Sequence, residues 1–174
     1  MKWHFINAVW GEEFVQTYLN ICLPFQLTKE NLIYVKNKAD ITYKIFTHRE
    51  DVKIIKTSIF YKKLAEIVNV KIISDEFDKK LRHEQMNHFH NIAIEEANKE
   101  DAALTFLFPD ILISKDSLKN LFFYIEKGKR FISVASIRIN KEKFVSNLKK
   151  LYKIKNFSYE FSHKELIKFC LPKL

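Results

Sequence analysis

The chain has 174 residues, of which 47% are hydrophobic and 14% aromatic, and its formal net charge is +9. A chain of this length and composition can bury one sizeable core, so we expect one folded domain. It contains no run of 18 apolar residues, which excludes a membrane-spanning helix. The first ten residues meet Gly11, Glu12 and Glu13 too early for a secretory signal. These features predict a cytoplasmic protein.

The rare residue types exclude two further classes of site. Cys22 and Cys170 lie in apolar contexts and lack metal-ligand spacing, which predicts two buried, reduced thiols and no cysteine nucleophile. The chain has only two glycines. A Gly-rich phosphate loop of the Walker A or GxGxxG type is therefore excluded.

The basic residues favour a small anionic partner over nucleic acid. Of 30 basic residues only four are arginines, whereas proteins that read bases and phosphates favour the bidentate arginine fork. We therefore expect no nucleic-acid partner. The excess charge could attract a nucleotide phosphate or an anionic lipid surface. Peripheral membrane contact would use the lysines of the last helices, which a solvated helix face explains equally well: Lys149, Lys150, Lys153 and Lys155.

Hydrophobic periodicity predicts alternating strands and helices. In chain order, the expected elements are a strand over 3–10, a helix over 12–22, a strand over 40–47, a helix over 57–68, a strand over 70–73, a helix over 83–99, a strand over 102–108, a helix capped by Ser114 and ended by Gly128, a strand over 130–139, and helices over 141–152 and 162–171. Five strands separated by helices imply a doubly wound α/β domain with a largely parallel sheet and helices on both faces.

Polar residues gather where the predicted strands end. Trp10, residues 47–50, Asp75 and Asp110 all follow or close a strand. Because carboxyl ends of parallel strands share one edge of the sheet, these residues could line one crevice. Asp110 follows Pro109, which has no N–H and cannot continue a central strand. The pattern indicates a small-molecule site, although a turn-forming acid after proline is an equally good interpretation of Asp110.

Two stretches around Asp110 resemble a known family: AIEEANKEDAALTFLFPD and FPDILISKDSLKNLFFYIEKGKRFISVASIRI. They are similar to GT-A type glycosyltransferases of the nucleotide-diphospho-sugar transferase superfamily, in a bacterial subgroup with "PD" in place of the usual two acids. The similarity spans about residues 3–170 and is pattern-level outside 92–138. It implies a nucleotide-sugar-binding domain over 1–140, with 141–174 as a helical extension of the same domain.

The resemblance also implies roles for individual residues. Asp110 would hold a divalent cation, Mn²⁺ or Mg²⁺, that bridges the donor's pyrophosphate. The remaining contacts to the nucleotide-sugar donor would come from Ala8, Val9 and Trp10 beside the nucleoside, Thr47 and Arg49 near the ribose or phosphates, and Asp75 against the base. Independently of the resemblance, the position of His88 on the helix before Asp110 suggests that it touches a phosphate. The expected activity is transfer of a sugar to an acceptor that the sequence does not identify, and no residue stands out as a catalytic base.

Three alternatives stay open. The chain could be a non-catalytic α/β binding module or a truncated transferase fragment. A PD-(D/E)xK nuclease fits less well, because that chemistry needs an acid and a lysine two residues apart on the next strand, whereas Glu126 and Lys127 are adjacent and end a helix. A metal site on His83, His88 and His90 also fits poorly, since the spacing places His88 on a different helix face from the other two.

Overall fold

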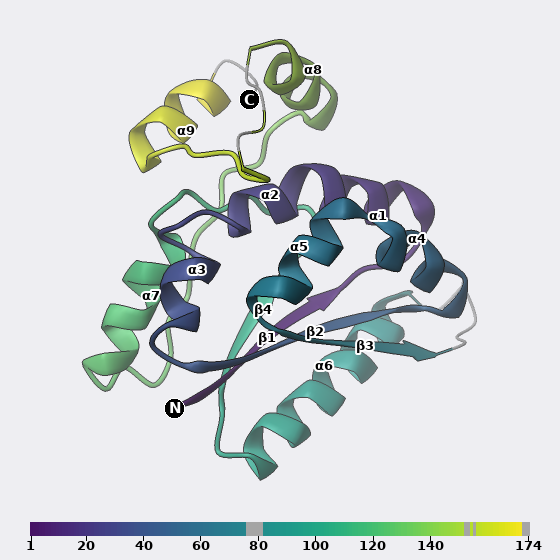
Figure 1. The fold of residues 1–174 in the computed structure, drawn as a ribbon, viewed down its shortest axis with the longest axis vertical. Helices are drawn as coiled ribbons and strands as arrows, with labels where there is room; N and C mark the ends of the chain where they lie inside the picture. The colour runs from purple at the N-terminus through teal and green to yellow at the C-terminus, as the bar shows by residue number, and fades with distance from the viewer. Residues whose placement is uncertain (76–81, 152–153, 155, 172–174) are drawn as a thin grey trace.

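The structure is a computed structural model that describes residues 1–75, 82–151, 154 and 156–171. In this part of the chain four parallel strands form one sheet in the order β3-β2-β1-β4 (Figure 1). The strands are β1 (Lys2–Ala8), β2 (Asp40–His48), β3 (Asn69–Asp75) and β4 (Ala103–Leu107). Each lies where the sequence predicts a strand.

Helices cover both faces of the sheet, which confirms the doubly wound α/β class (Figure 1). On one face lies α6 (Arg82–Lys99). On the other face lie α1 (Glu12–Thr17), the π-helix η1 (Tyr18–Cys22), α2 (Leu23–Gln26), α3 (Leu32–Lys36), the 3₁₀ turn η2 (Arg49–Asp51), α4 (Val52–Thr57), α5 (Ile59–Ile67) and α7 (Ser117–Glu126). The last two helices, α8 (Lys141–Leu151) and α9 (His163–Cys170), lie beside α2 (Figure 1).

Strand β1 is central because it pairs with β2 on one side and β4 on the other. Alternate side chains of a strand face opposite sides of a sheet. Trp3 and Phe5 therefore enter the large core beneath the many helices, and Ile6 and Ala8 enter a smaller core beneath α6. Burial on both faces explains why β1 carries large apolar side chains that point to either side.

Sequence signals for helix ends are confirmed at two places and wrong at a third. Ser162 caps α9 in a reciprocal capping box with Glu165, and Gly128 follows α7 at a φ of +73°. Ser114 does not cap α7, which begins three residues later after Asp116. Instead, Ser114 is buried and hydrogen-bonds to His163 of α9, so tertiary contact replaces the expected local cap.

The predicted fifth strand is wrong: residues 131–140 form no strand and connect α7 to α8 (Figure 1). Phe131, Val134 and Ile137 are 86%, 81% and 54% exposed. Strand propensity reflects packing on a pleated, half-buried surface, and this segment has neither a pairing strand nor a covering helix over most of its length. The composition of this segment favours a strand, but among the described residues no neighbouring strand is there to pair with it.

Two further sequence expectations concern thiols and membranes. Cys22 and Cys170 are both buried thiols, as predicted. Among the described residues, no helix has the length and apolar character needed to cross a bilayer.

The exposure of residues 131–137 predicts a small mutational effect. Val134→Ala should change the free energy of unfolding by less than about 0.5 kcal/mol, because an exposed side chain loses little contact. Ile45→Ala, at a fully buried position of β2, should cost about 2–5 kcal/mol. Urea denaturation measures both, and a cost above about 2 kcal/mol for Val134→Ala would instead place this segment in a packed sheet.

Candidate functional site

The carboxyl edge of the sheet is the candidate site. All four strands are parallel, so the segments that follow them leave from this one edge. The chain proceeds from β1 outward to β2 and β3 and then returns to β4 on the opposite side of β1. Open α/β sheets bind ligands outside the carboxyl ends of their strands, where the strand order reverses. Here the order reverses beside β1.

A carboxylate joins the loops that follow β1 and β2. The backbone N–H of Gly11 donates to Asp51 Oδ2 at 2.8 Å, and Asp51 is only 3% exposed. Gly11 has a φ of +81°, a conformation that suits glycine and lets its N–H reach the acid. Two residues earlier in the chain, the Val9 N–H donates to the Phe46 carbonyl oxygen at 2.9 Å. The two loops are therefore held together at the edge.

The imidazole of His48 is fixed from two sides. Its Nε2 lies 2.6 Å from Gln85 Nε2, which comes from the first turn of α6. The Trp10 ring stacks on it with centroids 5.6 Å apart and planes 20° apart. Phe89 packs edge-on against Trp10 at 5.9 Å. The side chain that closes β2 thus has a defined orientation.

His48, Glu50 and Asp51 form a group that could hold a metal ion. Each offers one donor atom, and these atoms lie within 4.8 Å of one another. His48 and Asp51 are buried, whereas Glu50 is exposed, so the group opens to solvent on one side. Among the residues that the structure describes, this is the single group of three or more such side chains close enough for a metal ion.

Several residues predicted from the sequence lie at this edge. Ala8 and Val9 are buried at the end of β1, with Trp10 half-buried after them. Thr47 is buried and, by strand alternation, faces the large core opposite to His48. Its Oγ1 has no hydrogen-bond partner among the described residues.

The other predicted residues are more dispersed. Arg49 begins η2 and is exposed, and His88 is exposed on α6 beside Phe89. Asp75 closes β3 opposite His48 in the strand register, but its side chain lies outside the described part of the structure.

Asp110 lies on a different side of the edge from His48. It is exposed in the loop after β4, and its charge reaches the thiol of Cys22 in η1. Burial raises the pKa of Cys22 to about 12, Asp110 adds to the rise, and Lys141 opposes it. Asp110 is not a member of the metal-capable group. The structure therefore brings the loops after β1 and β2 together and leaves Asp110 apart from their donor atoms.

Sequence reasoning missed part of the group. The polar run from Thr47 to Asp51 at a strand end was a visible signal, yet His48, Glu50 and Asp51 were not predicted as ligands. Gln85 carried no signal, because it meets His48 across 37 positions in the sequence through the packing of α6.

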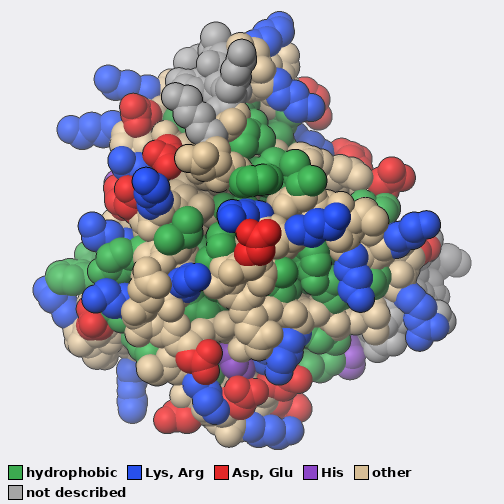
Figure 2. All heavy atoms as spheres, in the orientation of Figure 1, with side chains coloured by type: hydrophobic (Ala, Val, Ile, Leu, Met, Phe, Trp, Pro, Cys, Tyr) green, Lys and Arg blue, Asp and Glu red, His purple; other side chains and the backbone are tan. Residues whose placement is uncertain are grey.

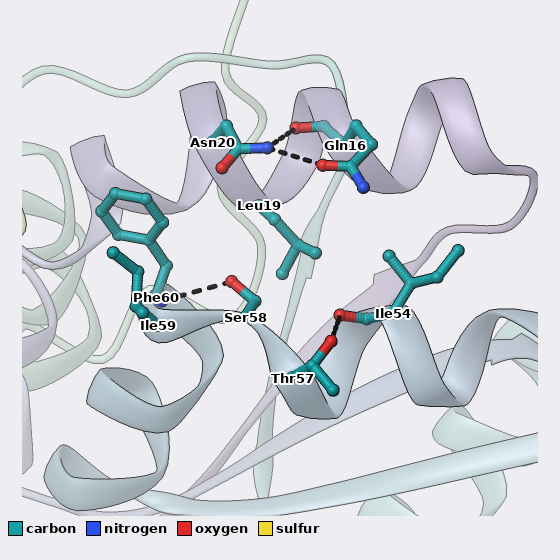
Figure 3. Close-up of a pocket in the computed structure, with 8 residues that line it drawn as sticks. All are labelled: Gln16, Leu19, Asn20, Ile54, Thr57, Ser58, Ile59 and Phe60. Carbon is teal, nitrogen blue, oxygen red and sulfur yellow. Dashed lines mark hydrogen bonds between the residues drawn. The ribbon is translucent and has the colours of Figure 1, made fainter.

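A separate hollow of about 210 Å³ lies between α1–η1 and α4–α5 (Figure 3). Its polar groups already bond locally: Asn20 donates to Gln16, Thr57 to the Ile54 carbonyl, and the Phe60 N–H to Ser58. No titratable side chain lines it. It is also smaller than most ligand pockets, so it is the weaker candidate.

The charge of the surface is spread out. On the face shown in Figure 2, Lys and Arg side chains are scattered, with Asp and Glu between them, and do not form one continuous stripe. A nucleic-acid interface typically gathers its basic residues on one face or groove. This view is compatible with the expectation of a small anionic partner.

Comparisons with known proteins identify no family. Neither the protein-family models, nor the curated proteins, nor the solved structures contain a significant match to this chain. The site must therefore be interpreted from its own residues.

Helix α6, which carries Gln85, is anchored to the sheet by a charged network. The buried Lys44 lies 2.7 Å from Glu96 Oε2 and 3.1 Å from His4 Nδ1, and His4 Nε2 lies 3.3 Å from Glu100 Oε2. Burial, followed by the charge of Lys44, lowers the pKa of His4, although Glu100 and Glu96 oppose this. Lys2, 3.9 Å from Glu100, completes the set of charged partners.

The lowered pKa of His4 predicts a pH dependence of stability. The unfolded chain takes up this proton at a higher pH than the folded protein, so the free energy of unfolding is greatest above the ordinary value of 6.5 and falls as the pH drops below it. His4→Gln, which cannot take up the proton, should flatten that fall. Urea denaturation between pH 7.5 and 5, which are about one unit above and 1.5 below the ordinary pKa, measures the slope. An unchanged slope would exclude His4 as its source.

The carboxylate of Asp51 predicts a second effect on stability. Asp51→Ala removes the acceptor of the Gly11 N–H and should lower the free energy of unfolding by about 1.5–3 kcal/mol. Asp51→Asn keeps one acceptor oxygen and should cost less. Equal costs, measured by thermal or urea denaturation, would show that the hydrogen bond to Gly11 is not what stabilises the two loops.

Proposed function

We propose that this chain is a glycosyltransferase that binds a nucleoside diphosphate sugar at the carboxyl edge of its sheet and transfers the sugar to an acceptor. The observation that carries the proposal is the convergence of the loops after β1 and β2 around a metal-capable group, beside the strand at which the sheet order reverses. Open α/β sheets bind ligands at this carboxyl edge, and the switch point of this sheet lies between β1 and β4, next to the loop after β1.

The chemistry of sugar transfer explains why such a group is useful. The leaving nucleoside diphosphate develops negative charge, and a divalent cation such as Mn²⁺ or Mg²⁺ stabilises it as a Lewis acid. Carboxylate oxygens are suitable ligands for both ions. The family resemblance favours Asp110 as the ligand, whereas the geometry favours His48, Glu50 and Asp51, because three donor atoms converge there.

The remaining residues of the edge fit an anionic, aromatic ligand. Trp10 is half-buried and could stack on a nucleobase, and the exposed Arg49 follows β2, where it could contact a phosphate. Thr47 lies at the same strand end, but its buried hydroxyl faces the large core, so its predicted contact with the ribose or a phosphate stays a prediction. The net charge of +9 would attract a diphosphate ligand.

A second function, binding without catalysis, is favoured by one observation. The glycosyltransferases that the sequence resembles usually carry two acids two residues apart, whereas here Phe108 precedes Pro109 and Ile111 follows Asp110. A nuclease is not supported, because Glu126 ends α7 and Lys127 is its C-cap, so neither lies on a strand. Peripheral membrane contact through the last turn of α8, Lys149 and Lys150, stays a prediction, and Lys153 and Lys155 lie outside the described residues.

Thermal denaturation with UDP, GDP or CMP, each with and without Mn²⁺, tests the proposal. A ligand that binds only the folded state raises the melting temperature, by the equivalent of about 2.7 kcal/mol at one hundred times its dissociation constant. We expect one nucleotide to stabilise the protein with Mn²⁺ and a smaller effect in Glu50→Gln.

Asp110→Asn separates the two metal positions, and Asp101→Asn is its matched control. Asp101 has a φ of +50°, which asparagine tolerates, and it lies just before β4 at the opposite edge of the sheet. Asp101→Asn should keep the full nucleotide effect. If a folded wild-type protein shows no shift with any of the three nucleotides, the transferase proposal is wrong.

A further inference from the structure

We propose that His48 binds a divalent cation through Nδ1 together with Glu50 and Asp51, and that Gln85 is the positioning residue that holds the proton on Nε2. This inference rests on the proposed function only for the role of the cation. The metal site can be tested without nucleotide, so either proposal can fail alone.

The contact with Gln85 determines which ring nitrogen is available. The Gln85 amide occupies Nε2 at 2.6 Å, so Nδ1 is the nitrogen left for a ligand. A neutral imidazole carries one proton, and a metal needs the nitrogen without it. Nε2 must then carry the proton and donate it to the Gln85 side-chain oxygen. This orientation differs from the opposite one only by exchange of the amide oxygen and nitrogen, which have the same shape. A histidine that binds metal usually donates its other N–H in this way.

The Gln85 side chain is a buried amide whose hydrogen bonds are incomplete. It is 1% exposed, yet one of its two amide polar atoms has no hydrogen-bond partner among the described residues. A buried polar group left unsatisfied destabilises the folded protein. The neighbouring inward positions of α6, Phe89 and Ala93, are apolar and pack in the small core. A buried amide with one of its atoms on the His48 ring, among apolar neighbours, fits a side chain that positions that ring.

Asp51 and Glu50 offer carboxylate oxygens close to the His48 ring. The Gly11 N–H engages Asp51 Oδ2 and leaves Oδ1 for a cation, and this backbone donor fixes the direction of the carboxylate. Trp10 stacks on His48 and opposes rotation of its ring. Glu50 completes the group from the solvent side, where water or a phosphate oxygen could fill the other positions.

The donor set favours Mn²⁺ as the probe. Carboxylate oxygens suit Mg²⁺, Ca²⁺ and Mn²⁺, and an imidazole nitrogen suits the transition metals. Mn²⁺ accepts both kinds of ligand. One nitrogen and two carboxylates therefore suit Mn²⁺ better than an ion that prefers only oxygen or only nitrogen ligands.

Electron paramagnetic resonance of Mn²⁺ titrated into the full chain tests the site, because binding removes the six-line spectrum of the free ion. We expect Glu50→Gln and His48→Gln to weaken binding by about tenfold or more. Glu84→Gln, an equal charge change at an exposed position of the same helix as Gln85, should bind like wild type. Circular dichroism checks that each variant is folded.

Two substitutions of Gln85 test its positioning role. Gln85→Ala should weaken Mn²⁺ binding about tenfold. Gln85→Glu keeps an acceptor for Nε2–H and should restore binding, which a merely structural loss would not do. Two-bond ¹H–¹⁵N spectra of metal-free protein should show the His48 proton fixed on Nε2 in wild type and shared between Nε2 and Nδ1 in Gln85→Ala. Unaltered binding and tautomer in Gln85→Ala would overturn the positioning role.

Two results would overturn the metal site. One is a free Mn²⁺ spectrum that stays unchanged with folded wild-type protein in millimolar excess. The other is binding that Asp110→Asn abolishes while Glu50→Gln leaves it intact. The second result would return the cation to the loop after β4.

Discussion

The hydrogen bond from Gly11 to the buried carboxylate of Asp51 is the interaction on which the proposed site depends. Parallel pairing brings the ends of β1 and β2 to one edge, but pairing alone does not determine the paths of the following loops. The carboxylate joins them, because Gly11 is the residue before α1 and Asp51 the residue before α4. Trp10 and His48 can stack only because these loops are adjacent.

The local patterns of the chain predicted most of the fold. The strand over 40–47, the helix over 83–99 and the capped last helix appear within one or two residues of their expected bounds. Each is determined by periodicity or by a cap in its own residues. Residues 131–139 have equally good strand composition but no strand to pair with, and pairing is a tertiary property that composition does not contain.

The same distinction applies to the site. Residues 47–51 close β2 or follow it, and the hydrophobic pattern of that strand is visible in the sequence. The sequence therefore placed them at the carboxyl edge of the sheet. Which of their side chains converge is decided by the turn of η2, by Gly11 from another loop and by Gln85 from α6. The charged contact of Lys44 with Glu96, which fixes α6 on the sheet, likewise joins distant parts of the chain. A pattern along the chain cannot report such contacts.

The most direct measurement of the central claim locates the ligand on the molecule. Paramagnetic broadening of ¹H–¹⁵N signals by substoichiometric Mn²⁺, first alone and then with a nucleoside diphosphate, maps the residues nearest the ion. The account predicts that Gly11, His48 and Gln85 broaden first, while Lys2 and Asn69 at the amino ends of β1 and β3 stay sharp. Broadening that begins at the amino edge, or around Lys149 and Glu142 on α8, would contradict it.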